Sequence, residues 1–251
     1  SAYHDANRLD DTRKGTFRRV LEVKQRLDHF GIEYNVLMTL TKTLARHPQQ
    51  VWRFMEEQDL HFVQMTPCMG PMNQAETPYA LTPERYASFY IALFDLWYQS
   101  YQKGIYRSVK LFDDLVNLLA VGQCNACGLV GSCQTQIVVE ADGGVYPCDF
   151  YVLDPYLLGH IGEQSFAGMA AGEAARAFVE PSRLVDEKCR SCRWGALCRG
   201  GCRRDREPAV DGVLQRNYFC PAFERFFGYA ASRLRQAAVW LSTGLPRSGR
   251  S

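Results

Sequence analysis

The spacing of its cysteines constrains this chain more than any other feature of the sequence. Four cysteines fall within residues 189–202, CRSCRWGALCRGGC, in the pattern C-x2-C-x5-C-x3-C. Nine of the ten cysteines follow residue 123, so the thiols are concentrated in the second half of the chain. Buried cysteines with only a packing role are common singly, but they do not cluster at such spacing. The ten are Cys68, Cys124, Cys127, Cys133, Cys148, Cys189, Cys192, Cys198, Cys202 and Cys220.

Clustered thiols form disulfides or bind metal. Disulfide frameworks belong to small secreted domains, whereas this chain has 251 residues, 47% of them hydrophobic, which is enough for a sizeable core. The two C-x2-C pairs, Cys124/Cys127 and Cys189/Cys192, keep a zinc site open on spacing alone. Two features favour iron–sulfur clusters instead: a Gly-Gly turn before the last cysteine of the run, and a Cys-Pro pair downstream at 220–221.

Ferredoxin geometry predicts how eight of these cysteines divide. In two-cluster ferredoxins the fourth cysteine of a run ligates the other cluster, because four thiolates on one short loop cannot all surround one cubane. By this logic Cys202, the last cysteine of the run, ligates the other cluster together with cysteines that come earlier in the chain. The predicted sets are Cys189, Cys192, Cys198 and Cys220 at one cluster, and Cys127, Cys133, Cys148 and Cys202 at the other.

Helices and strands are expected to alternate over the first hundred residues. Prolines stand where a first helical turn tolerates them, and Thr82 is a suitable N-cap before Pro83. This order favours βαβ units and a parallel sheet, but the units are too few to close a barrel, which suggests that further units precede them. The expected helices are 15–31, 47–59 and 82–104, and the expected strands are 33–40 and 61–67.

The second half of the chain has a different pattern. Residues 135–151 contain two β-rich runs around Asp142-Gly143-Gly144, which is typical of a hairpin. Helical stretches are expected near 165–179 and over 221–241, on either side of the cysteine run.

Five stretches of the sequence match a known family. They are CGLVGSCQTQIVVEADGGVYPCDFYVLDPYLLGHI, CRSCRWGALCRGGCRRD, NYFCP, YHDANRLDDTRKGTFRRVLE and HFVQMTPC. With these stretches the chain closely resembles the anaerobic sulfatase-maturating enzymes, which are radical S-adenosylmethionine (SAM) proteins with a C-terminal SPASM domain. The resemblance implies two auxiliary [4Fe–4S] clusters on the same two cysteine sets that the ferredoxin argument separates.

The resemblance also implies an α/β fold in three parts. Residues 1–107 would be the C-terminal part of a partial (β/α)6 radical SAM barrel. Residues 108–225 would be the SPASM domain, with a β-hairpin and helices, and residues 226–251 a C-terminal helix and tail. The family's C-x3-C-x2-C motif, which binds the SAM-cleaving cluster, does not occur in this sequence. We therefore expect the chain to be the C-terminal two-thirds of such an enzyme and to generate no radical alone.

The function implied by the resemblance is oxidation of a Cys or Ser in a sulfatase to Cα-formylglycine. The complete enzyme would bind SAM and a third [4Fe–4S] cluster, and its substrate would be an unfolded sulfatase segment of the C/S-x-P-x-R type. An electron donor such as flavodoxin or ferredoxin, a cytoplasmic location and a monomeric state are expected. Two alternatives remain open: a radical SAM/SPASM enzyme that modifies another peptide, for example by cross-linking, and a non-enzymatic zinc-binding interaction module.

Four residues outside the cluster sets have candidate roles. Asp149 follows a predicted ligand in YPCDFY, where a turn-capping role is the ordinary interpretation, and the resemblance implies a general base. Arg8, in HDANR, would bind the carboxylate of SAM or be a solvated loop charge. Cys124 is expected to be a packing residue or an alternative ligand beside Cys127. Cys68 follows a predicted strand, where an active-site group or a packing thiol is expected.

Charge and hydropathy exclude some classes of partner. The 29 basic and 27 acidic residues leave a net charge of +2, which gives no general case for nucleic acid or an anionic membrane. The longest apolar run, 89–98, is far shorter than the roughly 20 residues of a bilayer span. The basic residues Arg199, Arg203, Arg204 and Arg206 are expected to form a solvated face, with stabilisation of reduced clusters or docking of an acidic partner as alternatives.

Overall fold

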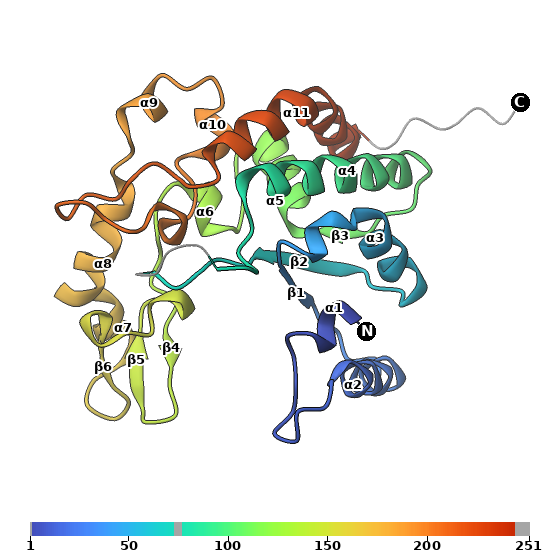
Figure 1. Ribbon diagram of the computed structural model, residues 1–251. Coiled ribbons are helices and arrows are strands. Elements are labelled where there is room, and N and C mark those ends of the chain that lie inside the picture. Colours follow the sequence, from blue (N-terminus) through green and yellow to red (C-terminus); the bar gives the residue numbers. More distant parts are fainter. Residues whose placement is uncertain (1, 73–76, 244–251) are drawn as a thin grey trace, which may run out of the picture. The chain divides into compact units, whose positions relative to one another are not determined.

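The computed structural model describes residues 2–72 and 77–243 of the chain (Figure 1). They form two compact units, which divide within one helix between Asp113 and Asp114. The domain boundaries expected after residues 107 and 225 remain predictions.

The first unit contains a parallel sheet of three strands. Its strand order is β1-β2-β3, and β1 pairs with β2 from Val36↔Val63 to Leu40↔Pro67. The predicted parallel βαβ arrangement is confirmed within this unit, although the sheet has too few strands to test the expected partial barrel. The strands are β1 (Val36–Leu40), β2 (Phe62–Pro67) and β3 (Ser108–Val109).

Helices connect these strands where the sequence predicts them. Helix α3 (Pro48–Glu57) joins β1 to β2 and has its proline in the first turn. Helix α4 (Pro83–Gln102) joins β2 to β3, and the Thr82 hydroxyl accepts a hydrogen bond from the Arg85 N–H at 3.4 Å, as expected of an N-cap.

Helix α4 supplies most of the aromatic core of the first unit. Its Tyr90 hydroxyl donates to the Met65 carbonyl in β2 at 3.2 Å, so the helix lies against the sheet. Phe89 and Phe94 are fully buried, and Phe94 meets Phe112 edge to face at 5.3 Å between ring centroids. Each such ring contributes roughly 1.5–3 kcal/mol when it is buried.

The remaining elements of the first unit precede the sheet or join its strands. Helix α2 matches the helix expected over 15–31, but none of its residues is buried. These elements are α1 (Ala2–Asp5), α2 (Phe17–His29) and the short 3-10 helix η1 (Leu44–Arg46).

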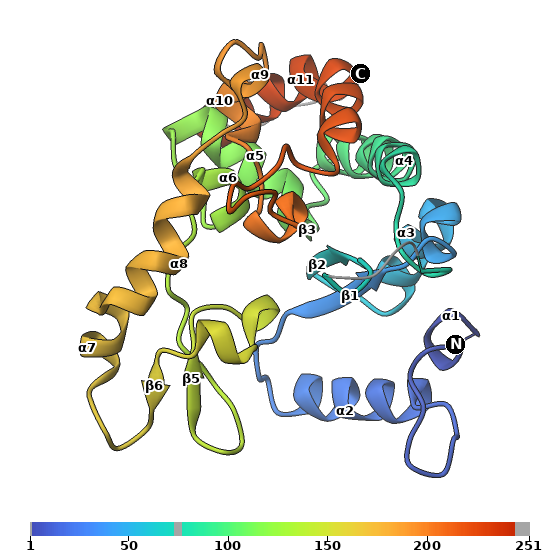
Figure 2. The ribbon, with the colours of Figure 1, turned by 60° about the vertical axis from the view of Figure 1, so that its left-hand side comes forward.

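The second unit contains an antiparallel sheet (Figure 2). The predicted hairpin is confirmed: β4 pairs with β5 in the register Val138↔Tyr146, and Asp142 accepts from the Gly144 N–H at 2.9 Å in the turn. A third strand, β6, pairs on the other side of β5. A small hydrophobic core in this unit buries Val145 and Met169. The strands are β4 (Val138–Val139), β5 (Gly144–Tyr146) and β6 (Gly159–His160).

Four cysteines of the second unit lie in helices (α6, α9, α10 and α11), and the others lie in the segments between its helices and 3-10 turns. The longest helix, α11, matches the terminal helix expected over 221–241 and buries one apolar side. The elements are α5 (Lys110–Val121, which begins in the first unit), α6 (Cys127–Val130), α7 (Phe166–Ala171), α8 (Glu173–Arg183), α9 (Glu187–Arg190), α10 (Gly195–Cys198), α11 (Cys220–Thr243), η2 (Asp149–Tyr151), η3 (Asp154–Tyr156) and η4 (Arg203–Arg206).

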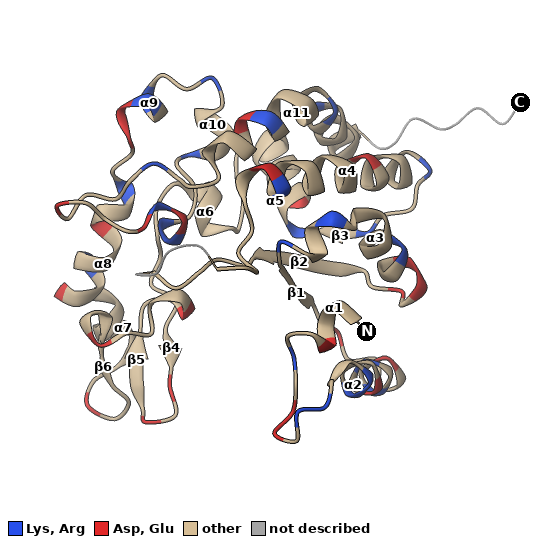
Figure 3. Ribbon diagram, in the orientation of Figure 1, with Lys and Arg blue, Asp and Glu red and all other residues tan. Residues whose placement is uncertain are grey.

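Charges of both signs are interspersed along the two units (Figure 3), in keeping with the small net charge. Among the described helices, none is both long enough and apolar enough to cross a membrane.

Candidate metal centres

Four thiols of the second unit gather at helix α6. Cys127 begins this helix, Cys133 lies in the loop after it, Cys148 lies at the end of the hairpin, and Cys202 directly precedes η4. The thiol of Cys127 interacts electrostatically with each of the other three, and Cys202 also interacts with Cys133. The fold therefore brings together one predicted set from four separate segments. We call Cys127, Cys133, Cys148 and Cys202 the first set, and Cys189, Cys192, Cys198 and Cys220 the second set.

Two glycines allow the Cys202 loop to lie against α6. A Cβ atom added to Gly128 would stand 3.2 Å from the Cys202 backbone nitrogen. Gly131 has a φ of +93°, and a Cβ there would lie 3.1 Å from the Cβ of Arg199. Larger residues at these two positions would push the segment between Arg199 and Cys202 away from the other thiols.

The second set of cysteines lines one hollow. Cys189 lies in α9, Cys192 in the following turn, Cys198 at the end of α10, and Cys220 at the start of α11. All four line a single cavity of about 470 Å³. Cys198 interacts electrostatically with the other three thiols. The second predicted set is thus also assembled in space, with a cavity between its members.

A turn of two glycines directs neighbouring cysteines to different sets. Gly200 and Gly201 have φ angles of +89° and +75°, in the left-handed region that favours glycine. A Cβ on Gly201 would stand 2.1 Å from the side-chain nitrogen of Asn217, which is itself buried. Cys198 before the turn belongs to the cavity set, and Cys202 after it lies at α6.

The donor chemistry of both sets fits iron–sulfur clusters. Each set consists of four thiols, and clusters of this kind are held by cysteine thiolates. In residues 2–72 and 77–243 no three His, Cys, Asp or Glu side chains converge on one ion. In a cubane each thiolate ligates a different iron, so the four sulfurs surround the cluster and do not meet at one point.

Burial keeps several of these thiols protonated in the absence of metal. It raises the pKa of Cys148 to about 12 and that of Cys198 to about 11, and it raises the pKa of Cys127 and Cys202 in the same direction. Binding of iron would have to displace these protons, so metal loading and proton release are coupled at both sets.

Asp149 lies at the edge of the first set. It begins η2 directly after Cys148, and its Oδ1 accepts from the Phe150 N–H at 3.1 Å and lies 3.3 Å from the Cys148 sulfur. The carboxylate is exposed and interacts electrostatically with Cys127. Asp149 therefore makes the backbone contact expected of a turn-capping residue, and its carboxylate is also accessible to solvent beside the thiols.

Comparison with known proteins finds an iron–sulfur domain in the part of the chain that holds several cysteines of the two sets. Residues 127–193 match the SPASM iron–sulfur cluster-binding domain. This match begins at the first cysteine of the first set and ends just after Cys192 of the second.

Similarity to curated proteins extends over almost the whole chain. A cysteine-type anaerobic sulfatase-maturating enzyme from Clostridium novyi is 38% identical over 241 residues, which cover 95% of this chain and 64% of that protein. The solved structure of native anSMEcpe with bound AdoMet and Cp18Cys peptide superposes with a TM-score of 0.91 at 36% identity, over 95% of this chain and 66% of that one. By these matches the chain is similar to the anaerobic sulfatase-maturating enzymes, and it contains a SPASM iron–sulfur cluster-binding domain. It spans less than two thirds of the length of the curated relatives that it matches.

The family also has more distant curated members. A serine-type anaerobic sulfatase-maturating enzyme from Bacteroides thetaiotaomicron is 24% identical over 247 residues, which cover 91% of this chain and 59% of that protein. The relatives of this chain are thus named as cysteine-type and serine-type sulfatase-maturating enzymes, and one solved relative binds AdoMet.

Arg8 lies in the first unit near the end of the parallel sheet. Its Nη2 donates to the Thr39 hydroxyl at 3.4 Å, and Thr39 is near the carboxyl end of β1. The side chain is exposed. In barrels of alternating strands and helices, this end of the strands carries the active-site loops.

The two cysteines outside the sets have local contacts. The Cys124 thiol donates to the Ala126 carbonyl at 4.0 Å, within its own loop. Cys68 follows β2, where its backbone N–H donates to the Leu40 carbonyl at 3.0 Å, and burial raises the pKa of its thiol.

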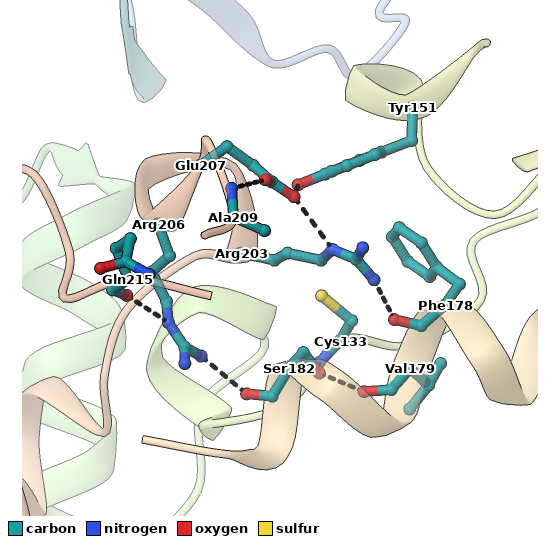
Figure 4. A network of polar contacts seen from close by, with 10 residues as sticks. All are labelled: Cys133, Tyr151, Phe178, Val179, Ser182, Arg203, Arg206, Glu207, Ala209 and Gln215. Carbon is teal, nitrogen blue, oxygen red and sulfur yellow. Dashed lines mark hydrogen bonds and ion pairs between the residues drawn. The ribbon is translucent and has the colours of Figure 1, made fainter. Parts of the chain in front are cut away.

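The expected solvated arginine face is wrong for three of its four members. Arg203, Arg204 and Arg206 are 7%, 9% and 3% exposed, because η4 turns them into the second unit. Figure 4 shows Arg203 beside Glu207, at 3.5 Å, with Tyr151 and Phe178 around it. Sequence reasoning missed this network. A signal was available in the sequence: Arg203 directly follows the predicted ligand Cys202, and Glu207 stands four positions after Arg203.

Proposed function

We propose that this chain forms the auxiliary-cluster part of an enzyme that oxidises a Cys or Ser of a sulfatase to Cα-formylglycine. Similarity to the sulfatase-maturating enzymes supports this function. The observation that carries it is the exposed Asp149 carboxylate, 3.3 Å from a thiol of a four-cysteine set. This position supports a role for Asp149 as a base beside a proposed electron acceptor.

The two cysteine sets are the proposed ligands of two [4Fe–4S] clusters. Their separation in the fold and the cavity within the second set support this assignment. One set is Cys127, Cys133, Cys148 and Cys202, and the other is Cys189, Cys192, Cys198 and Cys220. When bound, the clusters would supply an acceptor for the electron that the substrate gives up.

Asp149 would act as the general base. Oxidation of a cysteine side chain to a thioaldehyde removes a β-hydrogen atom, one electron and the thiol proton, and the exposed Oδ atoms can take that proton. The hydrogen atom is assigned to SAM-derived chemistry in the complete enzyme. Hydrolysis of the thioaldehyde then gives the aldehyde, whereas a serine would give it directly.

The first unit would face SAM. The Arg8 guanidinium at the end of β1 is suited to a bidentate contact with a carboxylate. The sequence contains no C-x3-C-x2-C motif, so we propose that the SAM-cleaving cluster lies in an additional part of the enzyme, within a partial (β/α)6 barrel.

An unfolded sulfatase segment of the C/S-x-P-x-R type is the proposed substrate. Identity to the cysteine-type relatives, 37–38%, exceeds identity to the serine-type relatives, 22–24%, which favours cysteine as the target residue. A flavodoxin or ferredoxin donor and a monomeric state belong to the same proposal.

The test replaces Asp149 by Asn in the complete enzyme and measures aldehyde formation in cysteine and serine peptides of this type. Turnover should fall by about 10²–10⁴-fold, the usual contribution of a general base, while the iron content stays unchanged. Asp154→Asn is the matched control, because Asp154 is also exposed and begins the next 3-10 turn, η3.

Three results would contradict the proposal. Unchanged turnover in Asp149→Asn would remove the residue from catalysis. A cross-linked peptide in place of an aldehyde would indicate another radical SAM/SPASM activity. A colourless, zinc-containing protein would exclude the cluster enzyme.

A further inference from the structure

Arg206 is a buried cation with an unusual set of partners. Its side chain donates only to backbone carbonyls: Nε to Gln215 at 3.1 Å, Nη1 to Ser182 at 2.8 Å, and Nη2 to Leu184. Within the described part of the chain, no carboxylate lies within ion-pair distance of it. Its positive charge is therefore held in the interior without a direct counter-ion.

Arg203, one turn earlier in η4, is different because it has a direct partner. Its Nε lies 3.5 Å from Glu207, and the same carboxylate accepts from the Tyr151 hydroxyl at 3.1 Å. Arg203 and Glu207 thus neutralise each other, and Glu207 acts on Arg206 only at longer range. The uncompensated charge of this network is Arg206 (Figure 4).

The contacts of Arg206 reach the first cysteine set through Ser182. The Ser182 carbonyl accepts from Arg206, while its hydroxyl accepts from the Cys133 backbone N–H at 2.8 Å and donates to the Val179 carbonyl at 2.5 Å. Figure 4 shows Cys133 and Arg206 on either side of this serine. Ser182 therefore links the loop of the predicted ligand Cys133 to Arg206.

Contacts in the other direction reach the second set. Arg206 binds the carbonyl of Leu184, and the next residue, Val185, lines the cavity of the second set together with Cys189. The guanidinium also interacts electrostatically with Cys189 of the second set and with Cys133 of the first. Arg206 is therefore close to both sets at once.

A buried positive charge makes an added electron nearby more favourable. The reduction potential of an iron–sulfur cluster depends on its surrounding charge, hydrogen bonds and exposure to solvent. In the protein interior a charge acts more strongly and over a longer range than in water. An arginine keeps its charge at every physiological pH, so this influence is permanent.

We propose that Arg206 is a positioning residue that lies between the two cluster sites and raises the reduction potentials of both clusters. This inference rests on the proposed pair of [4Fe–4S] clusters and adds a residue that sets their potentials together. Its charge favours receipt of an electron at the first site and its retention within the pair.

The experiment compares Arg206→Gln with the native full chain, each loaded with iron and sulfide without oxygen. Both midpoint potentials, measured by EPR-monitored titration, should become more negative in Arg206→Gln. We expect the ratio of reduced to oxidised cluster at a fixed potential to fall about tenfold, a shift of about 59 mV for one electron.

Two variants separate charge from structure. Arg206→Lys retains the charge but not the fork of donors, so its potentials should stay close to the native values. Arg183→Gln removes the same charge from a residue that lies in sequence between Ser182 and Leu184, but its side chain is 60% exposed and pairs with Glu180. Solvent screens such a charge, so this control should leave both potentials unchanged.

Each outcome decides the inference. If Arg206→Gln loses its iron while Arg206→Lys keeps both iron and native potentials, the charge is still supported. Unchanged potentials in a loaded Arg206→Gln, a shift at one cluster alone, altered potentials in Arg206→Lys, or iron loss in both variants would overturn the proposal. A native chain without two titrating clusters would instead refute the proposed function, and the inference with it.

Discussion

Gly201 determines where the chain can turn between the two thiol sets. Its φ of +75° lies in the left-handed region, and its Cα faces the Asn217 side chain so closely that no Cβ fits. Asn217 in turn accepts from the Phe219 N–H at 2.7 Å and donates to Asp205 at 3.4 Å. One residue without a side chain therefore supports the turn that leads from Cys198 to Cys202.

Replacement of Gly201 by Ala should lower the free energy of unfolding by about 1–3 kcal/mol, from backbone strain and from displacement of Asn217. Gly212→Ala is a matched control, since Gly212 has a φ of +76° but nothing within 4 Å of an added Cβ. Anaerobic denaturant unfolding measures both variants. Equal losses in the two would show that crowding at Gly201 contributes nothing.

At the scale of elements, the short helices α6, α9 and α10 matter because each carries a cysteine of a predicted set. None is longer than four residues, and such helices are not stable by themselves. Local hydrogen bonds hold the backbone of the second set, including those from the Cys192 N–H to the Cys189 carbonyl at 3.4 Å and from the Gly195 N–H to the Cys192 carbonyl at 2.9 Å. A cluster bound to both sides of the cavity would fasten α9 and α10 to the start of α11.

Replacement of Cys198 by Ser should halve the iron content, from about eight to about four per chain, because one of the two proposed four-iron clusters would lose a ligand in its cavity. Cys124→Ser should retain about eight, since Cys124 bonds only within its own loop. Iron and sulfide analysis after anaerobic purification measures both variants. Equal loss in the two would place Cys124 among the ligands, as the C-x2-C spacing with Cys127 also allowed.

At the scale of the whole molecule, the two units depend on different sources of stability. The first unit buries the large aromatic side of α4, which forms most of its core. The second unit also buries one apolar side of α11, but it gathers eight thiols, several with raised pKa values from burial, and its hairpin core is small. Metal binding to such a unit contributes directly to its folding.

Removal of iron by a chelator should therefore loosen the second unit selectively. Hydrogen exchange should speed up in peptides from residues 127–220, while peptides from α3 and α4 keep their protection. Mass spectrometry of the loaded and iron-free protein measures this difference. A uniform change over both units would indicate that the clusters do not stabilise the second unit in particular.

Local sequence signals predicted the secondary structure well. The hairpin follows from Asp142-Gly143-Gly144, and the start of α4 follows from Thr82 and Pro83, because turns and caps depend on residues close together in the chain. The division of cysteines into two sets follows from ferredoxin spacing, and the fold brings each set together. The ligand assignment itself remains a prediction.

Burial of the arginines was decided only by the tertiary structure. Arg203 and Arg206 lie in a polar run that resembles a solvated surface, yet Phe178, Ser182 and Glu207 surround them in the fold. The partners of Arg203 and Arg206 come mostly from segments about twenty residues away or more, so no local sequence pattern predicts these contacts. The sequence by itself predicted which thiols the fold gathers into each set, since spacing limits how a short loop can surround a cluster. Which charges lie between them depended on long-range packing, which only the folded chain reveals.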